Sequence, residues 1–157
     1  MQAGTLCSRE HQVVFCGLEV LRLMGERMEN EHDVDGEDLH LVMTFMRDVA
    51  HRCLDNTEEI LRFARLEQNV AKHGQARSLF DELSRADGAA FASACRSYTE
   101  LLANAIFEDR RCLSTLDCDP VTLSQFYEWE REVADVARQH GQTLHQLEMK
   151  YTTPHCI

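Results

Sequence analysis

The sequence has few residues that interrupt helices, with only two prolines and seven glycines among 157 residues. It also lacks the strand-like alternation of apolar and polar residues, and apolar residues instead recur at helical spacing almost throughout. No apolar run reaches the roughly 18 residues of a membrane span. The N-terminus does not join a basic segment to an apolar one, as a secretory signal does. These absences predict an all-α, cytoplasmic protein.

Basic residues are scarce as well: 16 Lys and Arg stand against 27 Asp and Glu, for a net charge of −11. This balance argues against nucleic acid and anionic membranes as partners, since both reward clustered positive charge. The seven cysteines are odd in number and none has C-x-x-C spacing, which disfavours a disulfide framework or a zinc ribbon. Catalytic triads, phosphate-binding glycine loops and dinucleotide fingerprints are missing, so no enzyme class is indicated.

The hydrophobic pattern predicts five helices in one domain spanning residues 1–157. The first helix is expected from Ser8 to about Glu29, and the second from about Glu37 to Glu67 with Asp35 as its cap. The third follows a break at Gln68 and Asn69 and ends at the "SRADG" segment, and the fourth begins after Asp87. The fifth begins near Pro120 and is expected to bend at Gly141. Short connections predict an up-down-up-down four-helix bundle over about 8–113, with an additional C-terminal helix at about 120–151 packed outside it.

Each of the four bundle helices places one ionisable side chain on its apolar face: His11, Glu58, His73 and Asp109. In an up-down-up-down bundle all four lie at the same end. Two carboxylates in one core layer repel each other unless a cation or protons intervene, so the layer predicts a metal site. The simpler alternative is that the histidines are hydrogen-bonded core residues and the carboxylates reach solvent.

Several segments in order carry a resemblance to a known family: "REHQVV", "HRCLDNTEE", "KHGQAR" and "YTELLANAIFED". From about Ser8 to Leu113 the chain resembles the hemerythrin-like family of cation-binding four-helix bundles. The resemblance implies an iron site of one or two ions, in which Glu58 and Asp109 bridge and His11 and His73 cap. It also implies binding, sensing or reaction with dioxygen, peroxide or nitric oxide.

The chain departs from the family pattern at the metal ligands. Leu54 and Ala105 stand where the family has histidines on the second and fourth helices, and Arg77 stands where some members carry a further histidine. The residues that could substitute as ligands are His51, Glu59 and Glu108. His51 has the alternative of a hydrogen bond inside the bundle.

Two functions follow from these departures. The first is a non-haem iron protein with an altered site. The second is a degenerate, metal-free bundle that works as an interaction or regulatory module, with a second copy or a regulatory protein as partner, and with its inward carboxylates paired to His11, His73 or Arg77. Two weaker alternatives remain. One is another cofactor in the emptied pocket near Ala105. The other is thiol redox sensing through Cys7, Cys16 or Cys53.

Overall fold

A computed structural model of the chain describes residues 8–63, 67–115 and 119–152, and within these ranges only 30–35, 86–87 and 119 lie outside helices. The elements in chain order are α1 (Ser8–Glu29), α2 (Gly36–Phe45), the π-helical turn η2 (Met46–Ala50), α3 (His51–Phe63), α4 (Glu67–Arg85), α5 (Gly88–Thr115) and α6 (Pro120–Thr152). The described residues contain no strand, so the predicted all-α class is confirmed.

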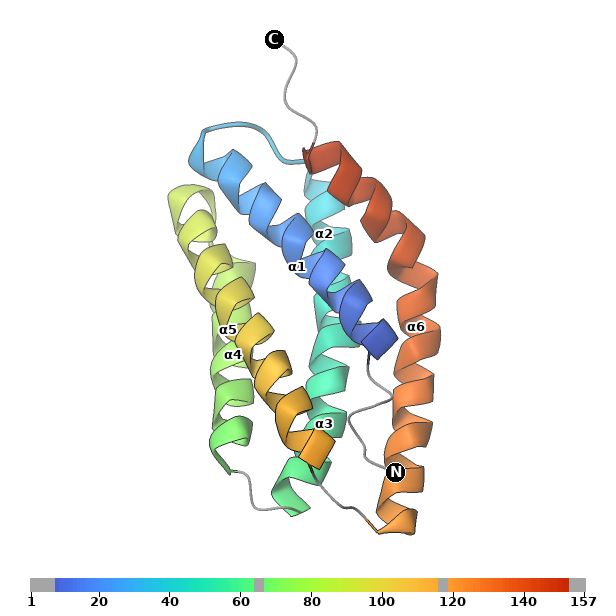
Figure 1. Cartoon of the computed structure of the whole chain (residues 1–157). Helices are drawn as coiled ribbons and strands as arrows, with labels where there is room; N and C mark the ends of the chain where they lie inside the picture. Colours follow the sequence, from blue (N-terminus) through green and yellow to red (C-terminus); the bar gives the residue numbers. More distant parts are fainter. Residues whose placement is uncertain (1–7, 64–66, 116–118, 153–157) are drawn as a thin grey trace.

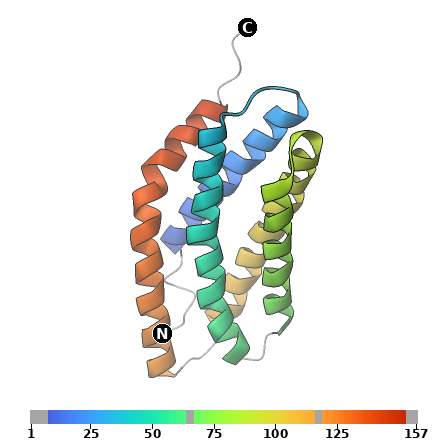
Figure 2. The same cartoon turned by 180° about the vertical axis from the view of Figure 1, so that it is seen from behind.

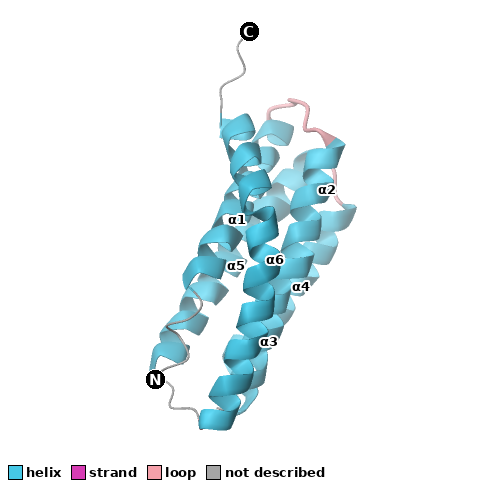
Figure 3. Ribbon diagram, turned by 90° about the vertical axis from the view of Figure 1, so that its right-hand side faces the viewer, coloured by secondary structure: helices cyan, strands magenta, loops and turns pink. Residues whose placement is uncertain are grey.

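Because α2, η2 and α3 follow one another without interruption, they form a single long rod, and the described residues form five rods in all. Each rod runs antiparallel to the one before it in the chain (Figure 1). α1 packs against α5 and α6, α4 against α5 and α3, and α6 against α1 and α3. Seen from the side, all the rods lie along the same long direction (Figure 3). No helix within the described ranges is both long and apolar enough to cross a bilayer.

Most predicted helix ends agree with the structure. The Asp35 side chain accepts a hydrogen bond from the Glu37 amide at 2.9 Å and caps α2 as expected. Pro120 is the first residue of α6, where the Asp119 carboxylate accepts from the Thr122 amide at 2.9 Å. The predicted break at Gln68 and Asn69 was wrong, because both residues lie in the first turn of α4. Helix α6 continues through Gly141 without interruption.

The largest cluster of buried side chains lies between the rods and includes Leu21, Met24, Phe45, Met46, Tyr98 and Leu102. Helix α6 is part of this core, since Val133, Ala137, Leu144 and Leu147 belong to the same cluster. The prediction that the C-terminal helix only packs outside the other helices was therefore wrong, because α6 contributes side chains to the core. A smaller cluster of buried side chains lies where the ends of α3 and α5 meet the start of α6, and consists of Ile60, Leu113 and Phe126.

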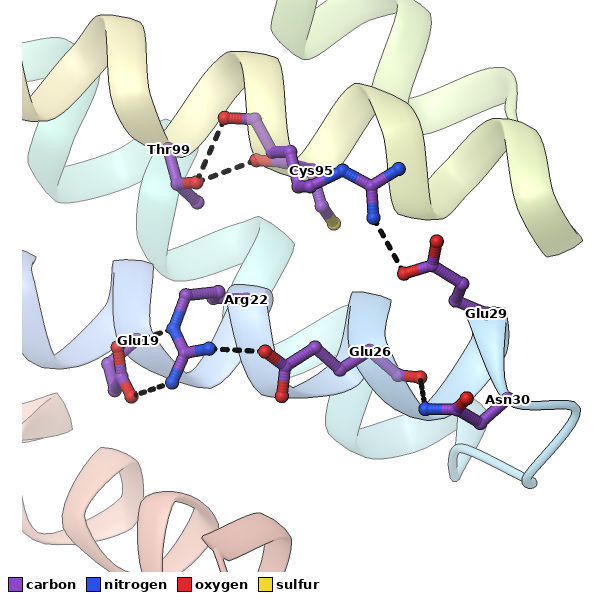
Figure 4. A network of polar contacts seen from close by, with 8 residues as sticks. Glu19, Arg22, Glu26, Glu29, Asn30, Cys95 and Thr99 are labelled. Atoms are coloured by element: carbon purple, nitrogen blue, oxygen red, sulfur yellow. Dashed lines mark hydrogen bonds and ion pairs between the residues drawn. The ribbon is translucent and has the colours of Figure 1, made fainter.

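The close packing of α1 on α5 depends on Gly25. A Cβ atom at this position would lie 3.0 Å from Cys95 Cβ, so a larger residue would push the helices apart. Ion pairs run along the exposed edge of this contact, among them Arg22 with Glu19 and Glu26, and Arg96 with Glu29 at 2.6 Å (Figure 4). Such exposed pairs contribute little to stability, so the packing holds α1 and α5 together.

Candidate functional site

Three of the four predicted site residues meet in the core. Glu58 lies late in α3, His73 early in α4 and Asp109 late in α5, and their exposed fractions are 8%, 0% and 4%. The antiparallel order of the rods brings these positions to one end of the molecule, as the sequence predicts. The fourth residue, His11, belongs to α1, but its side chain lies outside the described part of the structure.

The imidazole of His73 lies between the two carboxylates. Its Nδ1 is 3.2 Å from Glu58 Oε1, and its Nε2 is 2.5 Å from Asp109 Oδ2. An ionised carboxylate only accepts hydrogen bonds, and a neutral imidazole has a single N–H. His73 is thus the shared polar partner of both carboxylates and links α3 to α5 through α4.

Each carboxylate has a further partner. Arg77, one turn after His73 in α4, donates from Nη1 to Glu58 Oε1 at 2.7 Å and from Nη2 to the exposed Asp55. Asn69, one turn before His73, donates from Nδ2 to Asp109 Oδ1 at 3.1 Å. One face of α4 thus supplies donors to both carboxylates.

We call Glu58, His73, Arg77 and Asp109, together with Asn69, the polar layer. Its two carboxylates contact the His73 imidazole between them, and Glu58 also contacts the Arg77 guanidinium. Unpaired, each buried carboxylate would cost several kcal/mol. With these partners the buried groups of the layer are hydrogen-bonded, which makes the layer compatible with the core.

None of the three candidate substitutes joins the polar layer. Glu59 is exposed, and Glu108 forms an ion pair with Arg111 at 2.7 Å on the outer side of α5. His51 lies at the start of α3, apart from the polar layer. Its Nε2 is 2.9 Å from the Tyr98 hydroxyl. Its ring packs edge-on against the ring of Phe80, with 4.6 Å between the ring centroids. His51 therefore forms a hydrogen bond in the interior, which is the alternative to metal ligation that the sequence analysis gave for this residue.

His51 is held in its neutral form. Burial is the main cause that lowers the pKa of His51 from 6.5 to about 4, and the positive charge of Arg77 acts in the same direction. Its partner Tyr98 is fully buried, and this burial raises the pKa of the phenol above its ordinary value. The pair is therefore an uncharged hydrogen bond in the core at neutral pH.

The side chains present do not fit a pair of irons. A histidine ligates a metal through a ring lone pair, but both nitrogens of His73 face carboxylate oxygens on opposite sides of the ring. The Arg77 guanidinium already contacts Glu58 as a cation would. Leu54 and Ala105, each 1% exposed, bring only apolar groups to the two positions where the family has imidazoles. Across the described residues, no three His, Cys, Asp or Glu side chains are arranged to hold a metal ion.

Of the cysteines considered for thiol redox sensing, Cys16 and Cys53 lie in the described part of the chain. Burial first, and the nearby Glu148 second, raise the pKa of Cys16 to about 12, and its thiol donates to Glu148 Oε2 at 3.3 Å. Cys53 is 3% exposed. A thiol that stays protonated is a poor nucleophile, so Cys16 does not suit a redox sensor, and the burial of Cys53 shields that thiol from oxidants in solution. Cys7 lies outside the described residues.

Sequence reasoning missed three polar residues of the interior. Asn69 was placed in a break between helices, although it lies four residues before His73 and thus on the same helical face. Tyr98 was assigned to the core without a partner for its hydroxyl. Glu130 of α6, 4% exposed and 3.4 Å from Asn56 Nδ2, follows Phe126 by four residues, and that spacing could have revealed it.

Comparisons of the chain with protein-family models, with curated proteins and with solved structures gave no match. The resemblance to the hemerythrin-like family therefore stays a prediction that rests on the residues quoted for it.

Proposed function

We propose that this protein is a hemerythrin-like four-helix bundle, extended by α6, in which a network of internal ion pairs takes the place of the metal centre. In this proposal the protein is not an enzyme or an oxygen carrier, and works as an interaction or regulatory module. The observation that carries the proposal is the position of His73, which faces Glu58 and Asp109 with its two ring nitrogens.

The charges around His73 support a network that is complete without a metal ion. Glu58 contacts His73 at 3.2 Å, Arg77 at 2.7 Å and Arg62 at 4.0 Å, and Asp109 contacts His73 at 2.5 Å. Hydrogen bonds between ionised groups are the strong ones, and here they join α3, α4 and α5. In this role the layer fixes the register of three helices, which is the best-attested use of buried polar groups.

Metal analysis tests the proposal directly. The full chain, purified without chelator, is assayed by mass spectrometry before and after anaerobic incubation with ferrous ion, next to a buffer blank. We expect iron at the level of the blank in both samples. The His73→Ala variant, with its helical content checked by circular dichroism, is the control, and we expect it to give the same result.

An altered iron site is the second candidate, with dioxygen, peroxide or nitric oxide as its ligand. The observation that favours it is the convergence of two carboxylates and one imidazole from three helices, which is the donor set of non-haem iron sites. Stoichiometric iron in the wild-type chain that is lost in His73→Ala would establish this candidate and overturn the metal-free proposal.

A further inference from the structure

A groove opens between α2 and α4, at the end of the molecule away from the polar layer. Helix α4 packs against α3 and α5, and α2 against α1 and α6. Figure 2 shows the α2–α3 rod and α4 on the same side of the molecule, and residues of both line the groove. The groove has a volume of about 350 Å³, which lies at the small end of the range for ligand pockets.

The floor of the groove is apolar. It is formed by Leu39 and Met43 of α2 and by Phe80 of α4. Leu39 and Met43 are partly buried against the main core, and Phe80 is 9% exposed. A thioether and an aromatic ring make favourable contacts with flat apolar groups. The floor therefore suits a small ring system.

The rim of the groove is polar and carries positive charge. His40 and Arg47 lie on the α2 side and Ser84 on the α4 side, and no Asp or Glu lines the groove. In a chain with a net charge of −11, this is a local reversal of sign. Among the described residues Arg47 pairs only with Asp48, through Nε at 3.4 Å and with both side chains largely exposed, so its terminal nitrogens can bind an anion.

The backbone at this groove is irregular. Arg47 belongs to the π-helical turn Met46–Ala50, which interrupts the α-helical pattern between α2 and α3. Single π-helical turns inside α-helices occur frequently at functional sites, where they redirect side chains. The turn contains no proline or glycine, so neither of these residues accounts for it.

We propose that this groove binds a small organic anion with a flat apolar body and one carboxylate, such as an aromatic acid. The ring lies on Leu39, Met43 and Phe80, and the carboxylate accepts hydrogen bonds from Arg47 and His40. The proposal goes beyond the function proposed above and does not depend on it. The groove is separate from the polar layer, so metal analysis and ligand binding can succeed or fail independently.

Three probes of one ring system test the proposal: 2-naphthoate, the neutral 2-naphthylmethanol and the cationic 2-naphthylmethylamine. Each is titrated into ¹⁵N-labelled full chain and followed by NMR. We expect saturable shifts confined to residues around 36–47 and 80–84 for naphthoate, with binding about tenfold weaker for the neutral alcohol because a charge-assisted hydrogen bond is lost. The amine is expected to bind most weakly.

Two variants and a control locate the binding. Arg47→Gln should weaken naphthoate binding about tenfold, and Ser84→Trp should abolish it by filling the groove. Arg52→Gln, which removes the same charge from an exposed position of α3, should leave binding unchanged. Circular dichroism checks that each variant keeps its helical content.

Several outcomes would overturn the proposal. Equal binding of the acid and the alcohol would show that the groove does not select an anion. Shifts outside residues 36–47 and 80–84 would show that the probe binds elsewhere. Shifts at the same residues on raising the protein concentration without any probe would assign the groove to a second copy of the chain. An Arg52→Gln effect as large as that of Arg47→Gln would reduce the binding to nonspecific charge attraction.

Discussion

His73 Nε2 lies 2.5 Å from Asp109 Oδ2 and joins α4 to α5 inside the core. On the other side of the same ring, Nδ1 faces Glu58 at 3.2 Å. The ring nitrogens through which a histidine binds a metal thus both face carboxylate oxygens, which supports the proposal of an ion-pair network. This arrangement also makes His73 the residue whose loss should disturb the molecule most.

Replacing His73 by Ala should lower the free energy of unfolding by about 3–5 kcal/mol, because it removes the partner that two buried carboxylates share. Urea titration followed by circular dichroism measures the change. The triple variant Glu58→Gln, His73→Gln and Asp109→Asn removes the charges together and should lose less than His73→Ala does.

An exposed ion pair supplies the control for this comparison. Arg138 pairs with Asp135 on the surface of α6, and both side chains are mostly exposed. Arg138→Gln should change the free energy of unfolding by less than about 0.5 kcal/mol. If His73→Ala were as mild as Arg138→Gln, the polar layer would not be the ion-pair network described above.

Helix periodicity predicted the positions of the helices and the convergence of Glu58, His73 and Asp109, because a residue three or four places from buried neighbours shares their face. It could not predict the contacts within the layer. Whether the His73 ring turns both nitrogens to carboxylates depends on its rotamer and on the exact spacing of α3, α4 and α5. The π-helical turn Met46–Ala50 was missed for a related reason, since no proline or glycine marks it in the sequence.

The two histidines that the resemblance would place at positions 54 and 105 can be introduced to test it. Both positions are buried on α3 and α5. The double variant Leu54→His with Ala105→His should be less stable than the wild type without metal, since it buries unpaired polar groups. Anaerobic ferrous ion at about a hundred times its Kd should then raise its free energy of unfolding by about 2.7 kcal/mol.

Thermal unfolding of the double variant and the wild type, each with and without ferrous ion, provides the measurement. We expect stabilisation of the double variant alone. If ferrous ion stabilised neither protein, the correspondence of Leu54 and Ala105 to family ligand positions would be wrong. Stabilisation of both would instead favour an iron site in the wild type.

His51 should make stability depend on pH below neutrality. Its pKa is about 4 in the folded protein, lowered mainly by burial, against 6.5 in the unfolded chain. Between these values the unfolded chain binds a proton that the folded protein does not, so stability falls as the pH decreases from about 6.5 to 4. The shift corresponds to a loss of up to about 3 kcal/mol.

The His51→Gln variant isolates this contribution. Glutamine can still form a hydrogen bond with the Tyr98 hydroxyl, which His51 contacts at 2.9 Å, but it does not titrate. Urea titrations of both proteins at intervals from pH 4 to 7.5 should show a smaller loss of stability on acidification in the variant. Parallel curves for the two proteins would contradict the lowered pKa.

Two glycines inside helices, Gly17 and Gly141, should respond oppositely to replacement by alanine. At Gly17 of α1 a Cβ atom would lie 2.8 Å from Phe45 Cε1 and 3.2 Å from Met46 Sδ, beside the π-helical turn. Gly17→Ala should therefore lower the free energy of unfolding by about 1–3 kcal/mol through overpacking. At Gly141 of α6 no neighbouring atom lies within 4 Å of the added Cβ. Gly141→Ala should therefore raise the free energy of unfolding by about 0.5–1 kcal/mol, since glycine is a poor helix former. Urea titration of both variants against the wild type measures the two changes, and stabilisation by Gly17→Ala would show that α1 does not pack against Phe45 at this distance.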